Sequence, residues 1–475
     1  MRYLMDGARL AALGAMTLPS DLLHAVVERR RLVALVVGAG CSLESPTNLQ
    51  LARTYAEEAH RRLVEDGELG SDDCPDPSDL SAVASAVVAK CGSQRPLVIR
   101  LPRSDFRMAQ PNSGYLVTAA LLRESVLAAV ITLNFDLALT TALVMLGATD
   151  VDIITGPLAM DILGEAAVIY LHRSVEENDL ERWILTTVAL ERDWQDGWEE
   201  VIARRVTACP IVVFAGLGSP AAVLTESVTR VRQALDPTRH HVYVIDPAPT
   251  TQFQAALNLP KDAHLQTGWC AFMLELAERL VGEFSAELVS SAHHLCDENH
   301  WDDEVDYVSD LSKRLHSIGL VALGRLRSAW LMSDEPYLSE NEARRRLIAD
   351  LLLGVGLIER YVLHTARFRG NGIVELIDSG SVIGSILPMS GSGTLRWAGL
   401  EARAVEFVGR IDSTLRPEVV LTSGVTGYRS AETAAPEDII VGTTRDDIID
   451  GMQRPRFVSV DDIRADPGAM TQVFR

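Results

Sequence analysis

The sequence predicts an α/β fold with a doubly wound parallel sheet, followed by a helical segment and a small α+β module. Three observations support this prediction. Short runs rich in β-branched residues alternate with helical segments between residues 30 and 285. Glycine turns follow two of these runs, at 38–40 and 216–218. Beyond residue 368 the pattern changes to short strands separated by glycine and serine turns.

The first predicted strand, at 32–37, ends in a tight glycine turn within the sequence V-A-L-V-V-G-A-G-C-S. Such a turn lets backbone amides approach a phosphate closely. Alone it is weak evidence for a ligand, because the third glycine of the usual dinucleotide motif is missing and glycine often joins a strand to a helix. The candidate phosphate-binding residues of this turn are Gly38, Ala39, Gly40 and Ser42.

Helices are expected around the first two strands. Amphipathic or alanine-rich patterns predict helices from residue 22 onward and at 49–64, 79–90, 112–123 and 137–146. Asn48 is expected to be the N-cap of the helix at 49–64. The acidic segment 65–77 is expected to form a solvated loop, and 96–107 is expected to be irregular.

Further buried strands are predicted at 127–133, 151–155, 167–171, 211–215 and 242–245. Polar residues or glycines follow most of them. They are Asn134, Asp136, His172, Gly216, Gly218, Ser219 and Asp246. The carboxyl ends of parallel strands form one edge of the sheet, where open α/β folds bind ligands. We therefore expect these residues to contribute to one site.

The turn at 216–220, G-L-G-S-P, is the stronger anion-binding candidate. Ser219 is a favourable N-cap and Pro220 a favourable first helical residue, so a helix at 221–235 would present free amides toward the strand ends. For Asp246 the sequence leaves two interpretations open. Its carboxylate can accept hydrogen bonds from a ribose or near an adenine, or it can cap a turn.

Composition and charge limit the class of protein. The chain has 475 residues, 47% hydrophobic and 23% charged, which is an ordinary globular composition with room for two or three domains. The formal net charge of -21 argues against unaided binding to nucleic acid or to an anionic membrane. The six cysteines form no C-x-x-C pair, a pattern that suits reduced thiols in the cytoplasm.

Two apolar segments need separate explanations. Residues 1–18 resemble a signal peptide only faintly, because Asp6 and Arg9 interrupt the apolar part, and we expect an amphipathic helix there. The segment 125–148 is long and apolar enough to span a membrane, but its N-F-D sequence would lie near the middle, where polar groups are costly. A soluble strand, turn and buried helix is expected instead.

Four motifs occur in an order and spacing that resembles the sirtuin superfamily. They are G-A-G-C-S at 38–42, T-L-N-F-D at 132–136, L-H at 171–172 and G-L-G-S-P at 216–220. More specifically, they resemble the bacterial sirtuin-like branch of antiphage defence proteins, over residues 30–285. The resemblance implies a Rossmann-like sheet, NAD as the substrate and an NAD-consuming effector function. The rest of the chain lies outside it.

The resemblance also implies roles for individual residues. Asn134 matches the asparagine needed for chemistry at the nicotinamide ribose, His172 the catalytic histidine, and Asp136 the acid on the nicotinamide side. The phosphate-binding turn would comprise Gly38, Ala39, Gly40 and Ser42, and the adenosine half would be held by Gly216, Gly218 and Ser219, with Asp246 nearby.

The chain departs from the sirtuin pattern at several points. Leu133 replaces the glutamine before the asparagine, and Arg173 replaces the glycine after the histidine, where it can change access to His172 or add a cation near a phosphate. The paired cysteines of the deacylase zinc ribbon are absent, so no metal site is predicted. A further cluster, His293, His294, Cys296 and His300, has the wrong spacing for a structural zinc site.

The predicted activity is cleavage of the nicotinamide–ribose bond of NAD to give nicotinamide and ADP-ribose. The leaving group is neutral, so the site must mainly orient the dinucleotide and supply a nucleophile. Asn134 can hold a water molecule, and a histidine with a pKa near neutrality can act as general base. Base-catalysed cyclisation stays open. The alternatives are a non-catalytic NAD or ADP-ribose binding module that controls a partner, and a protein deacylase.

Four domains are predicted. They are an N-terminal helical extension at 1–30, a sirtuin-like catalytic domain at 31–284, a helical region at 285–367 and an α+β assembly or sensing module at 368–475. The resemblance implies a homo-oligomer, or a second subunit such as an ATPase or an Argonaute-like protein. Binding to membranes or directly to nucleic acid is not expected. The activating trigger and the partner cannot be derived from the sequence.

Overall fold

The chain forms two compact units, each built from segments that are distant in the sequence. The computed structural model describes residues 18–148, 150–156, 166–186, 188–189, 198–218, 222–234, 240–249, 252–301, 305–331, 342–389, 417–423, 456–466, 468, 470–471 and 474. The first unit comprises Met1–Met108, Val126–Asp136 and Ile153–Phe272, and the second comprises Ala109–Ser125, Leu137–Asp152 and Met273–Arg475. The helix expected at 1–18 lies almost entirely outside the described residues.

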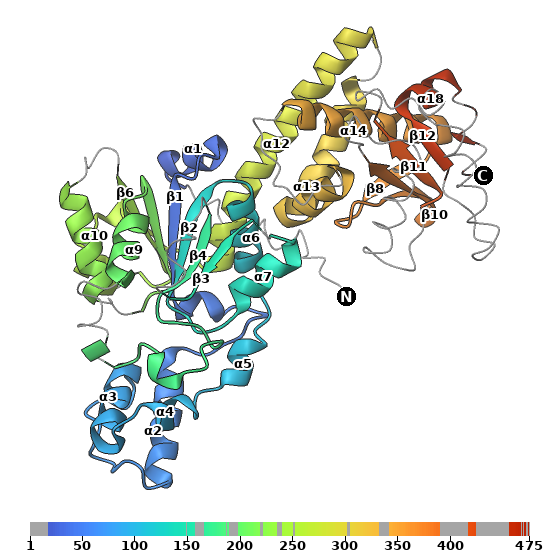
Figure 1. The fold of residues 1–475 in the computed structure, drawn as a ribbon. Coiled ribbons are helices and arrows are strands. Elements are labelled where there is room, and N and C mark those ends of the chain that lie inside the picture. The colour runs from blue at the N-terminus through green and yellow to red at the C-terminus, as the bar shows by residue number, and fades with distance from the viewer. Residues whose placement is uncertain are drawn as a thin grey trace. The chain divides into compact units, whose positions relative to one another are not determined.

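The first unit contains a seven-stranded sheet with the order β3-β4-β2-β1-β5-β6-β7 (Figure 1). Its strands are β1 (Val33–Val37), β2 (Leu127–Thr132), β3 (Asp152–Ile154), β4 (Ala167–Tyr170), β5 (Ile211–Ala215), β6 (His241–Ile245) and β7 (His264–Leu265). β1 pairs in parallel with β2 and β5, and the pairs β2–β4, β5–β6 and β6–β7 are also parallel. The sheet grows outward from β1 on both sides, so the predicted doubly wound α/β fold is confirmed.

Helices cover both faces of this sheet, which is why its central strands are apolar along their whole length. The helices of this unit are α1 (Ser20–Glu28), α2 (Ala52–Glu65), α3 (Leu80–Cys91), α4 (Arg95–Val98), α5 (Arg103–Arg107), α9 (Trp198–Thr207), α10 (Ala222–Ala234) and α11 (Gln252–Ala256), with short turns η2 (Ala39–Ser42), η4 (Leu180–Arg182) and η5 (Lys261–Ala263). β1 and β5 are entirely buried, as expected for parallel strands covered on both sides.

The core on one face is shared by the strands with α9 and α10 (Figure 1). Phe214 of β5 is fully buried there together with Ile202 of α9 and Val228 of α10. On the opposite face the Tyr243 hydroxyl of β6 donates to the Asp21 carboxylate of α1 at 2.7 Å. Alternate residues of β6 therefore face the two helical layers, as the two-residue period of a strand requires.

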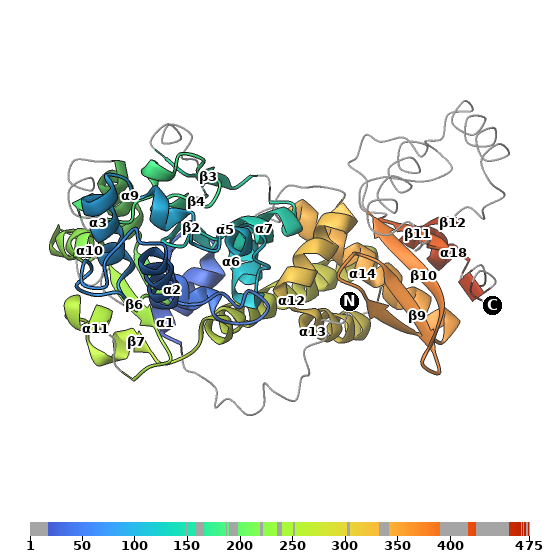
Figure 2. The ribbon, with the colours of Figure 1, turned by 90° about the horizontal axis from the view of Figure 1, so that it is seen from below.

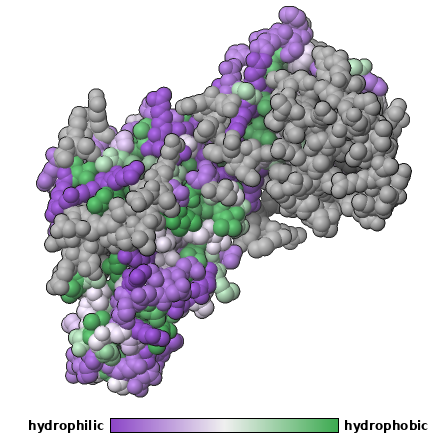
Figure 3. Space-filling view, in the orientation of Figure 1, coloured by the Kyte–Doolittle hydropathy of each residue, from purple (hydrophilic) through white to green (hydrophobic). Residues whose placement is uncertain are grey.

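Helices α2 to α5, all inserted between β1 and β2 in the chain, form a small helical lobe (Figures 1 and 2). Hydrophilic side chains cover much of its visible surface at the bottom of Figure 3. On α2, Glu58 pairs with Arg61 at 2.8 Å and with Arg62 at 2.7 Å. The visible surface of the lobe is therefore mostly polar, although the apolar side chains of Val88 and Ile99 are also exposed.

Two local predictions about the lobe are wrong. The first helix begins at Ala52 with Leu51 as N-cap, and Asn48, the predicted N-cap, precedes it with a left-handed φ of 50°. The segment 96–107, predicted to be irregular, contains most of α4 and all of α5. Pro96 lies in the first turn of α4, where its missing amide hydrogen costs nothing, so the proline starts a helix there instead of breaking one.

The second unit contains long helices and a five-stranded sheet with the order β12-β11-β10-β9-β8. Its elements are α6 (Ser113–Arg123), α7 (Ala138–Leu146), α12 (Trp269–Asn299), α13 (Val305–Leu331), α14 (Glu342–Val362), β8 (Thr365–Phe368), β9 (Val374–Asp378), β10 (Ser381–Met389), β11 (Val419–Thr422), β12 (Arg456–Ser459) and α18 (Val460–Ala465). α12 starts at the end of the first unit. β8, β9 and β10 are antiparallel, whereas β10, β11 and β12 are parallel.

The predicted helical segment and small α+β module are confirmed by this unit (Figure 2). α12 runs without interruption through residues 284 and 285, so the predicted domain boundary there is not marked by a break in secondary structure. Among the described residues, no helix combines the length and the apolar character needed to cross a lipid bilayer.

The turns that follow β1 and β5 pack directly against each other. Gly40 N donates to the Gly216 carbonyl oxygen at 2.9 Å. A Cβ atom on Gly38 would lie 2.7 Å from that oxygen, and one on Gly216, where φ is 66°, would lie 2.5 Å from Cys41 N. Close approach of two backbones therefore requires glycine at these positions. Gly218 differs, because a Cβ there would meet no atom within 4 Å.

Gly216→Ala should lower the free energy of unfolding by about 2 kcal/mol or more, because the added methyl group overlaps the Cys41 backbone and the positive φ disfavours alanine. Gly218→Ala, two residues along the same turn, is the matched control and should change the free energy by less than about 0.5 kcal/mol. Thermal unfolding of the full chain measures both variants. Equal shifts in Tm would contradict the packing role of Gly216.

Candidate functional site

The predicted site residues lie along the carboxyl edge of the seven-stranded sheet. Val37, Thr132 and Ala215 are in register at the ends of β1, β2 and β5. Tyr170 and Ile245 end β4 and β6 at the same level. The residues after these strands are thus brought to one edge, and they include Gly38, Asn134, Asp136, His172, Gly216, Gly218 and Asp246. Ser219 lies outside the described residues.

Ser42, Asn134 and Asp136 form a hydrogen-bond network that joins the end of β1 to the end of β2. The Asn134 side-chain amide donates to the Gly38 carbonyl oxygen at 3.1 Å and to Ser42 Oγ at 3.2 Å. Ser42 Oγ donates to Asp136 Oδ2 at 2.9 Å. The three side chains belong to residues that are only 2%, 8% and 6% exposed, so solvent screens these bonds weakly.

The backbone around Asn134 holds this network in place. Leu133 N extends the sheet by donating to the last carbonyl of β1 at 3.0 Å. Asn134 N donates to Thr132 Oγ1 at 3.1 Å, and the Phe135 carbonyl accepts from Val175 N at 2.9 Å. The N-F-D segment is therefore anchored on both sides, which gives its side chains defined directions.

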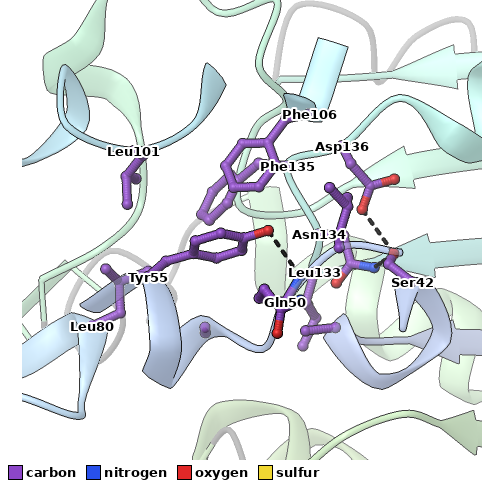
Figure 4. Close-up of a pocket in the computed structure, with 13 residues that line it drawn as sticks. Ser42, Gln50, Tyr55, Leu80, Leu101, Phe106, Leu133, Asn134, Phe135 and Asp136 are labelled. Atoms are coloured by element: carbon purple, nitrogen blue, oxygen red, sulfur yellow. Dashed lines mark hydrogen bonds between the residues drawn. The ribbon is translucent and has the colours of Figure 1, made fainter. Parts of the chain in front are cut away.

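A cavity of about 80 Å³, partly open to solvent, lies against the network (Figure 4). Ser42, Asn134 and Asp136 lie on one side of it. The opposite side is apolar and is formed by Tyr55, Leu80, Leu101, Phe106 and Phe135, most of them from the helical lobe. Polar groups on one wall and aromatic groups on the other are typical of small-molecule sites.

The aromatic wall of the cavity is a connected set of rings. Phe106 meets Tyr55 edge-on with ring centres 5.3 Å apart and is tilted against Phe135 at 6.4 Å. Phe135 stacks on Trp183 at 4.6 Å. Sequence analysis missed this wall, because its members come from separate helices and no spacing rule connects them. Phe135, inside the T-L-N-F-D motif, was the only signal available.

His172 follows β4 and forms a hydrogen bond with the backbone of Leu133. Its Nε2 atom is buried. This burial, with a smaller contribution from the charge of Arg173, lowers the pKa of His172 to about 4. The prediction of a pKa near neutrality is therefore wrong, and the ring is neutral at pH 7. Among the described residues, those that line the cavity do not include His172.

The amides of the first glycine turn are already used within the protein. Gly38 N donates to the last carbonyl of β5 at 2.9 Å, Gly40 N to the Gly216 carbonyl at 2.9 Å, and Cys41 N to the Gly38 carbonyl at 3.0 Å. Phosphate binding by this turn stays a prediction. It would depend on groups other than these three amides. The backbone amide of Ala39 is one candidate, because Ala39 lines the cavity.

Asp246 acts as the cap of a turn in this structure. Its Oδ1 accepts from Ala248 N at 2.8 Å, and its backbone carbonyl is bonded to His264 Nε2 at 3.2 Å. Turn capping was one of the two interpretations that the sequence left open. A contact of Asp246 with a ribose, like a contact of the exposed Gly218 with a dinucleotide, stays a prediction.

In the part of the chain that the structure describes, no group of three or more His, Cys, Asp or Glu side chains is arranged to hold a metal ion. The cluster singled out at the end of α12 is divided between two environments. His293, His294 and His300 are exposed, whereas Cys296 is buried in a small core with Ala349 and Leu353 of α14.

Neither protein-family models nor curated protein sequences match this chain. Solved structures of Sir2 enzymes do align with it. A Sir2 homologue in complex with NAD aligns with a TM-score of 0.31 and 18% identity, over 55% of this chain and 93% of its own. A Sir2 homologue variant in complex with ADP-ribose aligns with a TM-score of 0.32 and 18% identity, over 56% and 98%. At this similarity the alignments decide neither fold nor ligand, and the fold assignment rests on strand order and register.

Ser42→Ala should lower the free energy of unfolding by about 1–3 kcal/mol, because Asn134 loses an acceptor and Asp136 loses a donor in a buried site. Ser81→Ala is the control, since it also removes a hydroxyl bonded to a carboxylate, that of Asp79, but on the lobe surface. Urea unfolding followed by tryptophan fluorescence measures both variants. A loss no larger than that of the control would contradict the role of the network.

His172 should make the protein less stable as the pH falls. The unfolded chain takes up a proton near pH 6.5, whereas the folded chain does so only near its pKa of about 4. Between these values the unfolded state binds more protons, so stability is lost. His172→Gln should remove up to about 3 kcal/mol of this loss between pH 7 and pH 4. Urea unfolding between pH 7 and pH 4 measures the free energy of unfolding, with His24→Gln at an exposed histidine as the control. The same pH dependence of this free energy in the parent and in His172→Gln would contradict the prediction.

Proposed function

We propose that this chain is an NAD hydrolase that cleaves the bond between nicotinamide and ribose, releasing nicotinamide and ADP-ribose. The observation that carries the proposal is the Ser42–Asn134–Asp136 network facing an aromatic cavity at the ends of β1 and β2. Doubly wound folds bind dinucleotides at this edge. The sirtuin-like motifs in the sequence supply the chemical class of the ligand, because the network consists of motif residues.

The cavity suits the nicotinamide end of a dinucleotide. Tyr55, Phe106 and Phe135 offer faces and edges against which a flat heteroaromatic ring can pack. The Asn134 amide nitrogen is directed toward Ser42, and its side-chain oxygen points away from Ser42 (Figure 4). In this orientation the oxygen can accept a hydrogen bond from a ribose hydroxyl or from water. The network would thus hold the reacting ribose against the aromatic wall.

The proposed reaction places modest demands on acid–base groups. When the carbon–nitrogen bond breaks, its electron pair leaves with neutral nicotinamide, and the ribose carbon becomes electron-poor. Water then adds to that carbon and loses a proton. Neutral His172 can accept a proton, but its pKa of about 4 makes it a weak base. We therefore assign most of the rate enhancement to orientation by Asn134 and its partners.

A non-catalytic binding module is the second candidate. It is favoured by the low pKa of His172 and by the position of this residue outside the set that lines the cavity. Such a module would use the same network and aromatic wall to hold NAD or ADP-ribose, and would convey occupancy of the site to a partner. It would need neither Asn134 nor His172 for chemistry.

We further propose that the enzyme is a regulated cytoplasmic effector of bacterial antiphage defence that acts by abortive infection. This proposal rests on the motif resemblance. The enzyme would work as a homo-oligomer, with a second subunit such as an ATPase or an Argonaute-like protein, or both. The helices and five-stranded sheet of the second unit lie mostly outside the motifs, and we assign them to assembly or sensing.

Incubation of the purified full chain with NAD should release free nicotinamide. Asn134→Ala should lower the rate on the order of a hundredfold or more, because the ribose loses its orientation. His172→Ala should lower it by about tenfold or more. Ser81→Ala, which removes a hydroxyl on the lobe surface outside the cavity, is the control and should retain most of the activity.

The outcomes separate the two candidates. Release by the parent that depends on Asn134 supports the hydrolase. ADP-ribose binding by the parent without any nicotinamide release would favour the binding module. A parent protein that neither cleaves NAD nor binds ADP-ribose would contradict both.

A further inference from the structure

Strand β2, which leads to Asn134 and Asp136, is inserted between two helices of the second unit. α6 ends just before β2, and α7 begins just after Asp136. From this stretch only Val126–Asp136 belongs to the first unit, whereas the flanking segments Ala109–Ser125 and Leu137–Asp152 belong to the second. A displacement of α6 or α7 is therefore transmitted through the chain itself to both ends of the strand that carries the site.

A buried ion pair attaches α6 to α13 within the second unit. Arg327 of α13 pairs with Glu124, the residue that follows α6, and the two are only 1% and 5% exposed. The guanidinium carbon of Arg327 also lies 4.1 Å from the ring centre of Phe284 in α12. Removal of either charge would take its buried ion-pair partner from the other, which is destabilising and forces local rearrangement. The position of the end of α6 thus depends on this pair.

Two more arginines attach the end of α7 to the same block. Arg123 Nη1 of α6 donates to the Leu146 carbonyl at 2.8 Å. Arg325 Nη2 of α13 donates to the Met145 carbonyl at 3.1 Å. Both acceptors lie in the last turn of α7, where carbonyls have no partner within the helix and cations are favourable. α6, α7 and α13 therefore form one block, and between α6 and α7 the chain leaves this block to form β2 and the N-F-D segment.

We propose that Glu124 and Arg327 are positioning residues for the candidate site. They fix α6 to α13, and through the chain they set where β2 presents Asn134 and Asp136. The proposal deepens the proposed function, on which it rests for what the site does. A partner or ligand that displaced α13 would change the site by this route, without touching the cavity. The second unit would control the site through the position of β2.

The test compares Arg327→Met with Arg314→Met. Arg314 also lies in α13, but before the kink at Gly319, and it pairs with Glu359 of α14 at 2.6 Å, so its loss perturbs the second unit at another place. Hydrogen exchange read by mass spectrometry should become faster across residues 126–136 in Arg327→Met only. ADP-ribose affinity should fall by roughly tenfold or more, and kcat for nicotinamide release should fall more than KM rises.

Arg327→Lys keeps the charge and should restore most of the protection from hydrogen exchange and most of the kcat. This variant also keeps the test valid if Arg327→Met folds poorly. The proposal would be overturned if hydrogen exchange across 126–136 and ADP-ribose affinity changed no more in Arg327→Met than in Arg314→Met. The Glu124–Arg327 ion pair would then be a purely structural contact. A parent that releases no nicotinamide would instead contradict the hydrolase, while the exchange measurement would still decide the positioning role.

Discussion

The hydrogen bonds from the Asn134 amide to Gly38 and Ser42 are the constraint on which the candidate site depends. They join the segments that follow β1 and β2, and because Ser42 Oγ accepts from Asn134, its hydrogen is left to be donated to Asp136. An amide at 8% exposure that lost these partners would cost about 1–3 kcal/mol. These hydrogen bonds therefore form only when the glycine turn keeps its conformation, β1 and β2 keep their register, and the Asp136 side chain faces Ser42.

Much of the first unit could be predicted from the sequence because its strands are short, apolar and flanked by turn residues. β5 has the predicted bounds, and β1 and β2 differ from theirs by one residue. β7 was missed, since two residues are too few for any periodicity. The carboxyl ends of parallel strands lie at one edge of the sheet. The fold class alone therefore predicted that the residues after β1, β2, β4, β5 and β6 lie close to one another.

The cavity and the electrostatics could not be predicted in the same way. Tyr55 and Phe106 meet because α2 and α5 fold into one lobe, and nothing in their spacing encodes that contact. The pKa of His172 depends on how deeply its ring is buried, which a residue pattern does not report. The glycines show the same limit, because Gly38, Gly40 and Gly216 fit a phosphate-binding motif and a tight backbone contact equally well.

The path of the chain gives the site a property that neither unit has alone. Most strands of the first sheet are joined by segments of the same unit, but β2 begins and ends in helices of the other. Since Asn134 and Asp136 directly follow that strand and Ser42 does not, a shift of β2 would change distances within the network before it changed the sheet. Hydrogen bonds weaken steeply with such misalignment. A site built across β1 and β2 is therefore sensitive to the second unit by construction, whatever that unit binds.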